Sequence, residues 1–343
     1  MRGQQIIVLV KVDNQTYQKI ESLVKGARYA SIESFVELAV RNQLLLETEG
    51  RIATVKDRDA KVIPDSDGPQ LSIPQQEPRA LGMSPLKESV RNMPIWGQVN
   101  RLAPAKFVLR ILLNSLTGSD ERSIDLKRFS AETAEKATEF RLFSKKKDKT
   151  SRVRGTELYV AFPKREPSSQ QRFLNYYVGK APLQKWTDSI LTGLSFANIE
   201  ETDEGAVVIG LTESGLKLAL LHSPLIDDFF LDGKQITSPF SNEETSFLIE
   251  HIRSTRPGEY DFLSFTLTFI KKGADTPTKL KDRISEFLKS RDLGFKFSEK
   301  VANTMQVGAT GRLIELGLLK IEKQAQKSKY VVSERGEELI GKL

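Results

Sequence analysis

The chain has 343 residues, of which 39% are hydrophobic, and it carries a formal net charge of +7 with a sequence pI of about 9.3. This length allows two or three domains with cores of their own, and the basic balance favours an anionic partner, most often nucleic acid. The absence of cysteine excludes disulfides, thiolate zinc sites, iron–sulfur clusters and a cysteine nucleophile, and two histidines are too few for a histidine-rich metal site.

Charge is distributed unevenly along the chain. Residues 101–180 hold 18 basic and nine acidic residues, residues 181–250 hold three basic and 12 acidic, and residues 251–343 hold 18 basic and 12 acidic. This alternation predicts a molecule with a preferred cationic face. No apolar run approaches the ~20 residues that span a bilayer, and "IIVLV" is too short for a signal peptide. We therefore expect a soluble, cytoplasmic protein with no membrane partner.

Residues 4–49 predict a strand followed by two helices. The strand is "QQIIVLVKVD", the first helix covers roughly 14–26 and ends at a glycine, and the second covers 31–44 with Ser31 as its cap. A segment of this size cannot bury its own apolar faces, so it must pair with a second copy or lie on another domain.

The pattern "VLVKVDNQTYQKIESLV", the turn "KGARYAS" and "IESFVELAV" resemble the ribbon-helix-helix domain of the MetJ/Arc family of prokaryotic DNA-binding proteins. The resemblance implies a homodimer through residues 4–49, whose paired strands form a ribbon in the DNA major groove. Gln5 and Lys11 would then face DNA, and the amides near Ser31 would hold a phosphate. Ile7 and Leu9 share that strand face but cannot hydrogen-bond base edges. Three alternatives stay open: a ribbon that reads DNA, one that only dimerises, and a strand buried on both faces.

Residues 50–92 are rich in Pro, Gly, Asp, Ser and Gln and predict a linker, either flexible or draped over a neighbour. The chain beyond predicts two domains, 93–236 and 237–343, in a mainly α fold with small β elements (α+β). The predicted elements of the first domain are a helix beginning near Pro104, a helical stretch from Ser123 to Lys145 broken near Ser130, a strand "ELYVAFP" and a serine-capped helix "SSQQRFLNYYVG".

Residues 190–221 and 313–343 form an internal repeat. Ile199-Glu200 matches Ile321-Glu322 at an offset of 122, and Thr212-Glu213 matches Ser333-Glu334 at an offset of 121. Each copy predicts a helix end, a strand, a polar tip, a second strand and a final helix capped by Thr212 or Ser333.

The repeat resembles the wing and closing helix of winged-helix domains, the helix-turn-helix variant of prokaryotic transcription regulators, closely over 298–343 and more loosely over 105–221. The middle region also resembles uncharacterised prokaryotic, archaeal regulators of this type. The resemblance implies that the helix at 298–317 enters the major groove, with four apolar side chains inward and five polar ones outward toward base edges. The inward residues are Val301, Met305, Leu313 and Leu316, and the outward ones are Lys300, Asn303, Gln306, Thr310 and Arg312.

The wing of the second copy, "KQAQKSK", would offer Lys323, Lys327 and Lys329 to phosphates; the alternative is an ordinary solvated helix with a lysine-rich turn. The wing of the first copy, "EETDEGA", carries four acids and is expected to stay off DNA, as a protein contact or a solvated tip. The run "RLFSKKKDKTSRVR" is either a phosphate-binding stretch or a solvated loop; its candidate contacts are Lys145, Lys146, Lys147, Lys149, Arg152 and Arg154.

These patterns predict a homodimer that binds double-stranded DNA, most simply a transcription regulator, with no cofactor and no enzymatic activity. The alternative is a protein-interaction or assembly subunit, for example of a defence or DNA-scaffolding complex. "GLTESGLK" lacks the lysine of a P-loop, and we expect Asp227, Asp228 and Asp232 to form a solvated loop rather than a metal site.

Overall fold

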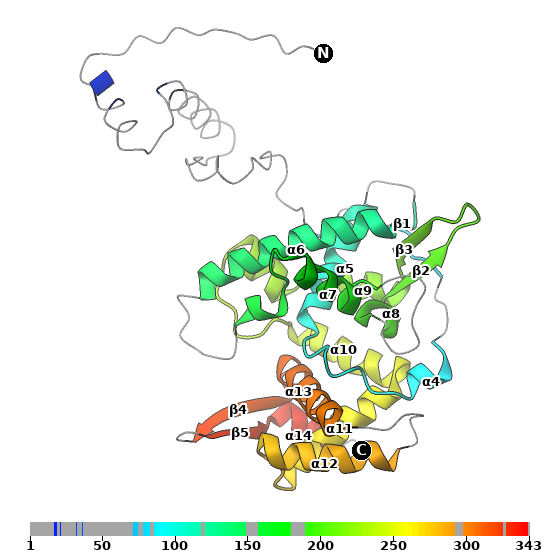
Figure 1. Cartoon of the computed structure of the whole chain (residues 1–343), viewed down its shortest axis with the longest axis vertical. Helices are drawn as coiled ribbons and strands as arrows, with labels where there is room; N and C mark the ends of the chain where they lie inside the picture. Colours follow the sequence, from blue (N-terminus) through cyan, green and yellow to red (C-terminus); the bar gives the residue numbers. More distant parts are fainter. Residues whose placement is uncertain are drawn as a thin grey trace. The chain divides into compact units, whose positions relative to one another are not determined.

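The computed structural model divides the chain into an N-terminal unit, Met1–Gly68, and a C-terminal unit, Pro69–Leu343 (Figure 1). The residues that it describes are 71–74, 78–82, 86–117, 121–148, 157–179, 189–291, 298–324 and 327–341, together with Tyr17, Gln18, Glu21, Ile32 and Val36. In the N-terminal unit all five described residues are helical, as the two predicted helices require. The predicted strand at 4–12 lies outside the described residues.

The described part of the C-terminal unit is mainly helical, with short antiparallel strands. Its helical elements are α4 (Glu88–Arg91), α5 (Ala103–Leu116), α6 (Leu126–Asp148), η1 (Leu158–Ala161), α7 (Pro167–Tyr177), α8 (Ile190–Gly193), α9 (Glu213–Leu220), η2 (Pro224–Leu231), α10 (Asn242–Thr255), α11 (Pro257–Lys271), α12 (Pro277–Ser290), α13 (Glu299–Glu315) and α14 (Glu334–Ile340). Its strands are β1 (Ile124–Asp125), β2 (Ala197–Glu201), β3 (Val207–Leu211), β4 (Leu319–Gln324) and β5 (Lys327–Val332).

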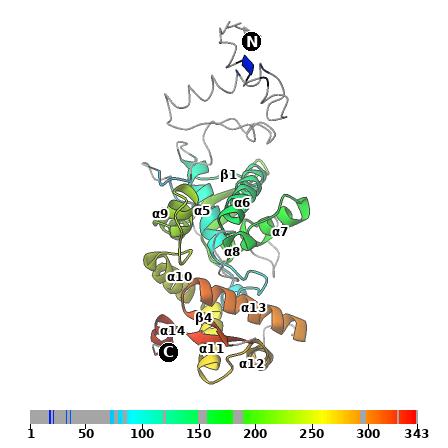
Figure 2. The ribbon, with the colours of Figure 1, turned by 90° about the vertical axis from the view of Figure 1, so that its left-hand side faces the viewer.

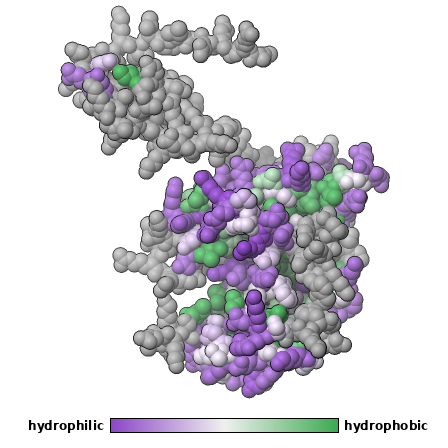
Figure 3. All heavy atoms as spheres, viewed as in Figure 1, coloured by the Kyte–Doolittle hydropathy of each residue, from purple (hydrophilic) through white to green (hydrophobic). Residues whose placement is uncertain are grey.

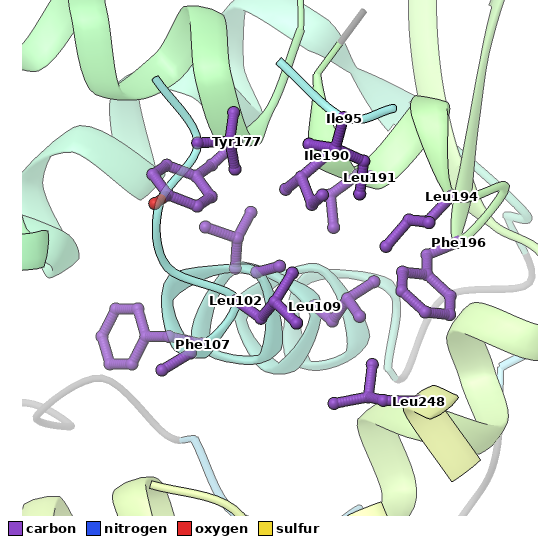
Figure 4. Packing of buried hydrophobic residues seen from close by; sticks show 14 of the residues in the cluster. Ile95, Leu102, Phe107, Leu109, Tyr177, Ile190, Leu191, Leu194, Phe196 and Leu248 are labelled. Atoms are coloured by element: carbon purple, nitrogen blue, oxygen red, sulfur yellow. The ribbon is translucent and has the colours of Figure 1, made fainter. Parts of the chain in front are cut away.

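Helix α5 forms the centre of the core. It begins with the predicted proline in its first turn, and every residue from Ala103 to Leu113 is buried. Because this part of α5 is buried on every side, other elements must surround it, and α5 contacts α6, α7, α8, α9, η2 and β3. Figure 4 shows this packing along α5: Ile190 and Leu191 of α8 and Leu248 of α10 lie near Leu109, and Tyr177 of α7 lies toward Leu102.

The internal repeat extends beyond the two hairpins. The first repeat, α5 to α9, and the second repeat, α11 to α14, both run helix, short extended segment, helix, further helix, hairpin and closing helix. In the first repeat the extended segment is β1, which pairs with β3 and gives the strand order β1-β3-β2. In the second repeat Tyr330 N donates to Asp275 O at 2.8 Å. Tyr330 corresponds to Ile209 and Asp275 to Ile124, so this hydrogen bond stands where β3 pairs with β1 in the first repeat. Both predicted hairpins are confirmed.

The two repeats use the same hydrogen bonds where each hairpin joins its closing helix. The Thr212 hydroxyl accepts from Gly215 N, and the Ser333 hydroxyl accepts from Gly336 N, both at 3.1 Å, so both predicted caps are confirmed. Each hydroxyl also donates to the carbonyl of the residue two positions before its hairpin, Ser195 or Gly317, and that residue has a positive φ of 54° or 67°. A turn that needs positive φ favours glycine, which only the second repeat supplies.

Three predicted elements of the first repeat differ in the structure. Helix α6 is continuous over 23 residues, so the break predicted near Ser130 is wrong; Ala, Glu and Lys favour helix throughout this stretch. The stretch "ELYVAFP" forms η1 instead of a strand, because Arg141 donates to the carbonyls of Tyr159 and Phe162 that a partner strand would need. The serine cap of α7 is also wrong: the helix begins at Pro167, whose fixed φ suits a first turn.

Part of the predicted linker packs on the first repeat. Leu71 is fully buried, and its carbonyl accepts from Arg110 Nη1 at 2.7 Å. Leu81 N donates to Leu211 O, also at 2.7 Å, and the Leu81 side chain lies over Gly210, where a Cβ would collide with it. The linker was expected to be either flexible or draped over a neighbour, and residues 71–74 and 78–82 follow the second alternative.

Candidate nucleic-acid interface

The C-terminal end of α6 presents unpaired cations. Lys145 and Lys146 are exposed, and neither has a hydrogen-bond or ion-pair partner among the described residues. Lys147 is also exposed, but its ammonium lies 5.8 Å from the centroid of the Phe143 ring and 3.4 Å from Gly233 O. These lysines sit where the helix dipole is negative, which stabilises them. The rest of the basic run, Lys149, Arg152 and Arg154, lies outside the described residues.

The first turns of α13 agree with the prediction. Ser298 caps the helix, its hydroxyl accepting from Val301 N at 3.3 Å. Lys300 and Asn303 are exposed, and Met305, Leu313 and Leu316 are buried at 2% exposure or less. This end of the helix therefore leaves one cation and one amide open to solvent.

The second half of α13 contradicts the prediction. We expected Gln306, Thr310 and Arg312 to face outward, but they are 2%, 4% and 0% exposed. The connecting segment, which we define as residues 93–102 between α4 and α5, covers this side of the helix. It can approach closely because Gly97 packs on Gly308: a Cβ on Gly308 would lie 2.5 Å from Gly97 Cα.

The three buried side chains are engaged inside the protein. Gln306 donates to the Tyr330 hydroxyl at 3.1 Å, and Thr310 donates to Gln306 O at 3.0 Å. Arg312 pairs with Glu259 of α11 at 2.8 Å, with both side chains fully buried, and also donates to Val99 O at 2.5 Å. None of the three is available to bases, so they are no longer candidates for base contacts.

Charged side chains of the second repeat also hold the start of α5. Helix α5 has no side-chain cap of its own, and the Glu315 carboxylate accepts from Leu102 N at 2.5 Å and from Ala103 N at 3.0 Å. Arg101 lies 3.5 Å from the same carboxylate. Burial raises the pKa of Glu315, and its opposing neighbour Arg101 lowers it. Because this cap comes from α13, it fixes the position of one repeat relative to the other.

A second buried charge cluster lies where α9 ends. Lys106 and Arg110 of α5 donate to the last carbonyls of that helix, Lys106 to Leu218 O at 2.5 Å and Arg110 to Ala219 O at 2.9 Å. Lys106 also lies 3.1 Å from Glu244 of α10. Burial lowers the pKa of Lys106 to about 8, against the opposing effect of Glu244.

The acidic stretch after α9 is not the solvated loop that we expected. It forms the π-helical segment η2, in which Leu225 and Ile226 are buried. Asp227 pairs with Arg110 at 2.7 Å, whereas Asp228 and Asp232 both face Lys234. Within the described ranges, no group of three or more potential ligands could hold a metal ion.

The two hairpins differ in charge. In the first repeat the tip carries four exposed acids, Glu200, Glu201, Asp203 and Glu204. In the second repeat Lys320 is exposed and Lys329 lies 3.0 Å from Asp275, so part of its charge is neutralised. Lys327 lies on β5, but its side chain and that of Lys323 are outside the described residues.

In the N-terminal unit, Gln5, Lys11 and Ser31 lie outside the described residues. Tyr17 of the first helix is 43% exposed, and Ile32 and Val36 of the second helix are half-buried. An exposed aromatic side chain agrees with the expectation that this unit cannot cover its own apolar faces.

Helix α7 was predicted as a helix, but none of its residues was among the predicted DNA contacts. It carries exposed Gln171 and Arg172, and exposed Lys164 and Arg165 lie just before it. The sequence offered one indication of such a role, because this helix precedes the first hairpin as the helix at 298–317 precedes the second. The residues at 145–185 do not follow the spacing of the second repeat, so the two helices could not be matched from the sequence.

No protein-family model, curated protein or solved structure matches the chain. Of the helices that the structure describes, none has the length and apolarity to cross a membrane.

Proposed function

We propose that the protein is a homodimeric, double-stranded DNA-binding protein of the transcription-regulator type. In this proposal the N-terminal unit is a ribbon-helix-helix domain that joins two chains, and each repeat of the C-terminal unit is a winged-helix-like domain. Support comes from the shared order of elements in the two repeats, in which a helix precedes a hairpin and a capped helix closes the domain.

The observation that carries the proposal is a set of unpaired surface lysines. Lys145 and Lys146 at the end of α6, Lys300 at the start of α13 and Lys320 on β4 are exposed, and none has a hydrogen-bond or ion-pair partner within the described ranges. In Figure 1 the C-terminal end of α6 and the β4–β5 hairpin extend to the same side of the C-terminal unit, the side that faces the viewer in Figure 2. Unpaired lysines on two elements that extend to the same side suit the spaced phosphates of a duplex.

A second candidate is a protein-interaction subunit. The acidic hairpin β2–β3 would repel phosphate, and the buried polar side chains of α13 remove three expected base contacts. Both features suit a protein partner, and the salt dependence of DNA binding separates the two candidates.

The substitution pair Lys145→Gln and Lys146→Gln is expected to weaken binding to every duplex alike. Each phosphate contact contributes about 0.9 to the slope of log affinity against log salt, so the double variant should reduce that slope by up to about 1.8. The measurement is fluorescence anisotropy of a labelled duplex over a salt series. Stability should not change, since neither side chain makes a hydrogen bond or an ion pair with the residues that the structure describes.

The matched control lies on the same helix. Lys127 and Arg128 are exposed at the opposite end of α6, about 27 Å away at 1.5 Å per residue. Replacing both with glutamine should leave the slope unchanged. Equal effects of the two double variants, or a wild-type affinity that ignores salt, would count against DNA contact by this end of α6 and favour the protein-interaction candidate.

The full-length chain is expected to sediment as a dimer, because the apolar faces of the N-terminal unit need a second copy. Val36→Asp, within the predicted second helix, should yield monomers by placing a charge in that interface. Gln18→Asp is the control, because Gln18 is exposed in the same unit. A wild-type monomer at micromolar concentration would refute dimerisation.

A further inference from the structure

The two repeats place a helix at the same position but use it differently. Helix α13 packs on α12 and leads into β4, and α7 packs on α6 and leads through α8 into β2. Residues 190–193 of α8 correspond, at the offset of 122, to the last turn of α13. The offset does not extend to α7, which it would place on residues 289–299; α7 is matched to α13 by its place before the hairpin and by its packing on α6. We infer that α7 is the element that reads base sequence in the proposed DNA complex, through Gln171 and Arg172, while α13 is mainly structural. This inference rests on the proposed function.

The polar groups of the two helices differ in availability. On α13 the polar groups already have partners inside the protein: Gln306 donates to the Tyr330 hydroxyl, and Arg312 pairs with Glu259. On α7 Arg172 is exposed and has no hydrogen-bond or ion-pair partner among the residues that the structure describes. Gln171 donates to Asn175 Oδ1 at 3.0 Å across one helical turn, which leaves its own oxygen free to accept. A guanidinium with all five donors available is the group best suited to the two acceptors of guanine.

The surroundings of α7 suit a polyanion. Lys164 and Arg165 precede the helix and are exposed, and the neighbouring acid, Glu166, lies 3.9 Å from Lys164. From Lys164 to Tyr177 the stretch holds three basic residues and one acid. Figure 3 shows hydrophilic and hydrophobic side chains mixed over this face of the C-terminal unit, so the local excess of cations, and not a uniformly hydrophilic surface, supports this point.

Helix α7 is also accessible and firmly held. Only Phe173 and Tyr177 of the helix are buried, and in Figure 2 the helix stands at the right-hand edge of the C-terminal unit. Its last turn is anchored to the connecting segment: Tyr176 donates to Gln98 Oε1 at 2.7 Å and Tyr177 to Arg101 O at 3.1 Å. A major groove admits one α-helix, and a helix fixed at its C-terminal end can present its first two turns without losing order.

The test begins with selection of preferred sequences from randomised duplexes by the full-length protein. Affinity is then measured for the preferred duplex and for a scrambled one, with wild type, Arg172→Lys, Arg172→Ala and Gln171→Ala. Arg172→Lys keeps the charge but cannot make two parallel hydrogen bonds, so we expect it to lose about 5- to 100-fold of the preference while keeping the salt slope. Arg172→Ala should also lose the preference, and the slope should stay close to that of wild type because phosphate contacts set it.

The control is Arg283→Lys on α12, where Arg283 is exposed and pairs with Glu286 at 2.9 Å; it should change nothing. Wild-type binding with a preference that survives Arg172→Lys and Gln171→Ala would overturn the inference and leave the proposed function intact. Binding to all duplexes alike would do the same. Failure of the wild type to bind any duplex would overturn both. Duplex RNA should show no preference, because side chains cannot read its narrow major groove.

Discussion

Replacing Arg312 with methionine is expected to lower the free energy of unfolding by about 3–5 kcal/mol. Arg312 and Glu259 are both fully buried and lie 2.8 Å apart, and Glu259 also accepts from Ile95 N at 2.7 Å. Without the guanidinium, the buried carboxylate loses its ion-pair partner and keeps only the weaker attraction of Arg256. Chemical denaturation followed by tryptophan fluorescence, to which Trp96 on the connecting segment contributes, measures the loss.

Two further variants separate this explanation from a simple loss of packing. Adding Glu259→Leu removes the buried charge that has lost its partner, so the double variant should recover most of the stability. Replacing both members of a buried ion pair with apolar residues is often neutral or stabilising. Arg283→Met breaks the exposed pair with Glu286 and should cost less than about 1 kcal/mol. A loss at Arg312 no larger than that at Arg283 would contradict the buried-charge account.

Replacing Gly308 with alanine should destabilise the protein, although the same change in an exposed helix usually stabilises it by roughly 0.5–1 kcal/mol. The new Cβ would lie 2.5 Å from the Cα and the carbonyl oxygen of Gly97. Both partners are backbone, so neither can rotate away, and α13 must separate from the connecting segment. We expect a net loss of roughly 1–3 kcal/mol.

Thermal unfolding of Gly308→Ala beside Gly82→Ala tests this expectation. A Cβ on Gly82 would meet nothing within 4 Å, so that variant should stay within about 0.5 kcal/mol of wild type. A midpoint for Gly308→Ala at or above that of wild type would show that the two segments do not pack as closely as described.

The elements that could be predicted from the sequence depend on short-range chemistry. A hydroxyl three residues before a glycine, as in Thr212–Gly215 and Ser333–Gly336, forms its cap within one turn, whatever lies further away. The hairpins followed for the same reason, because alternating strands on either side of a polar tip pair locally. The repeat could therefore be recognised from the sequence alone, as a nearly constant offset between matching residues.

Which side chains are available to a partner depends on long-range contacts, and a local sequence pattern does not contain them. Helical periodicity places Arg312 and Gln306 away from the apolar stripe of α13, and a polar side chain there looks the same whether it meets water or another segment. Burial was decided by residues more than 200 positions earlier, such as Val99, whose carbonyl accepts from Arg312. Only the fold shows which cations remain unpaired, since a charge is neutralised by whatever the tertiary structure brings within about 4 Å of it.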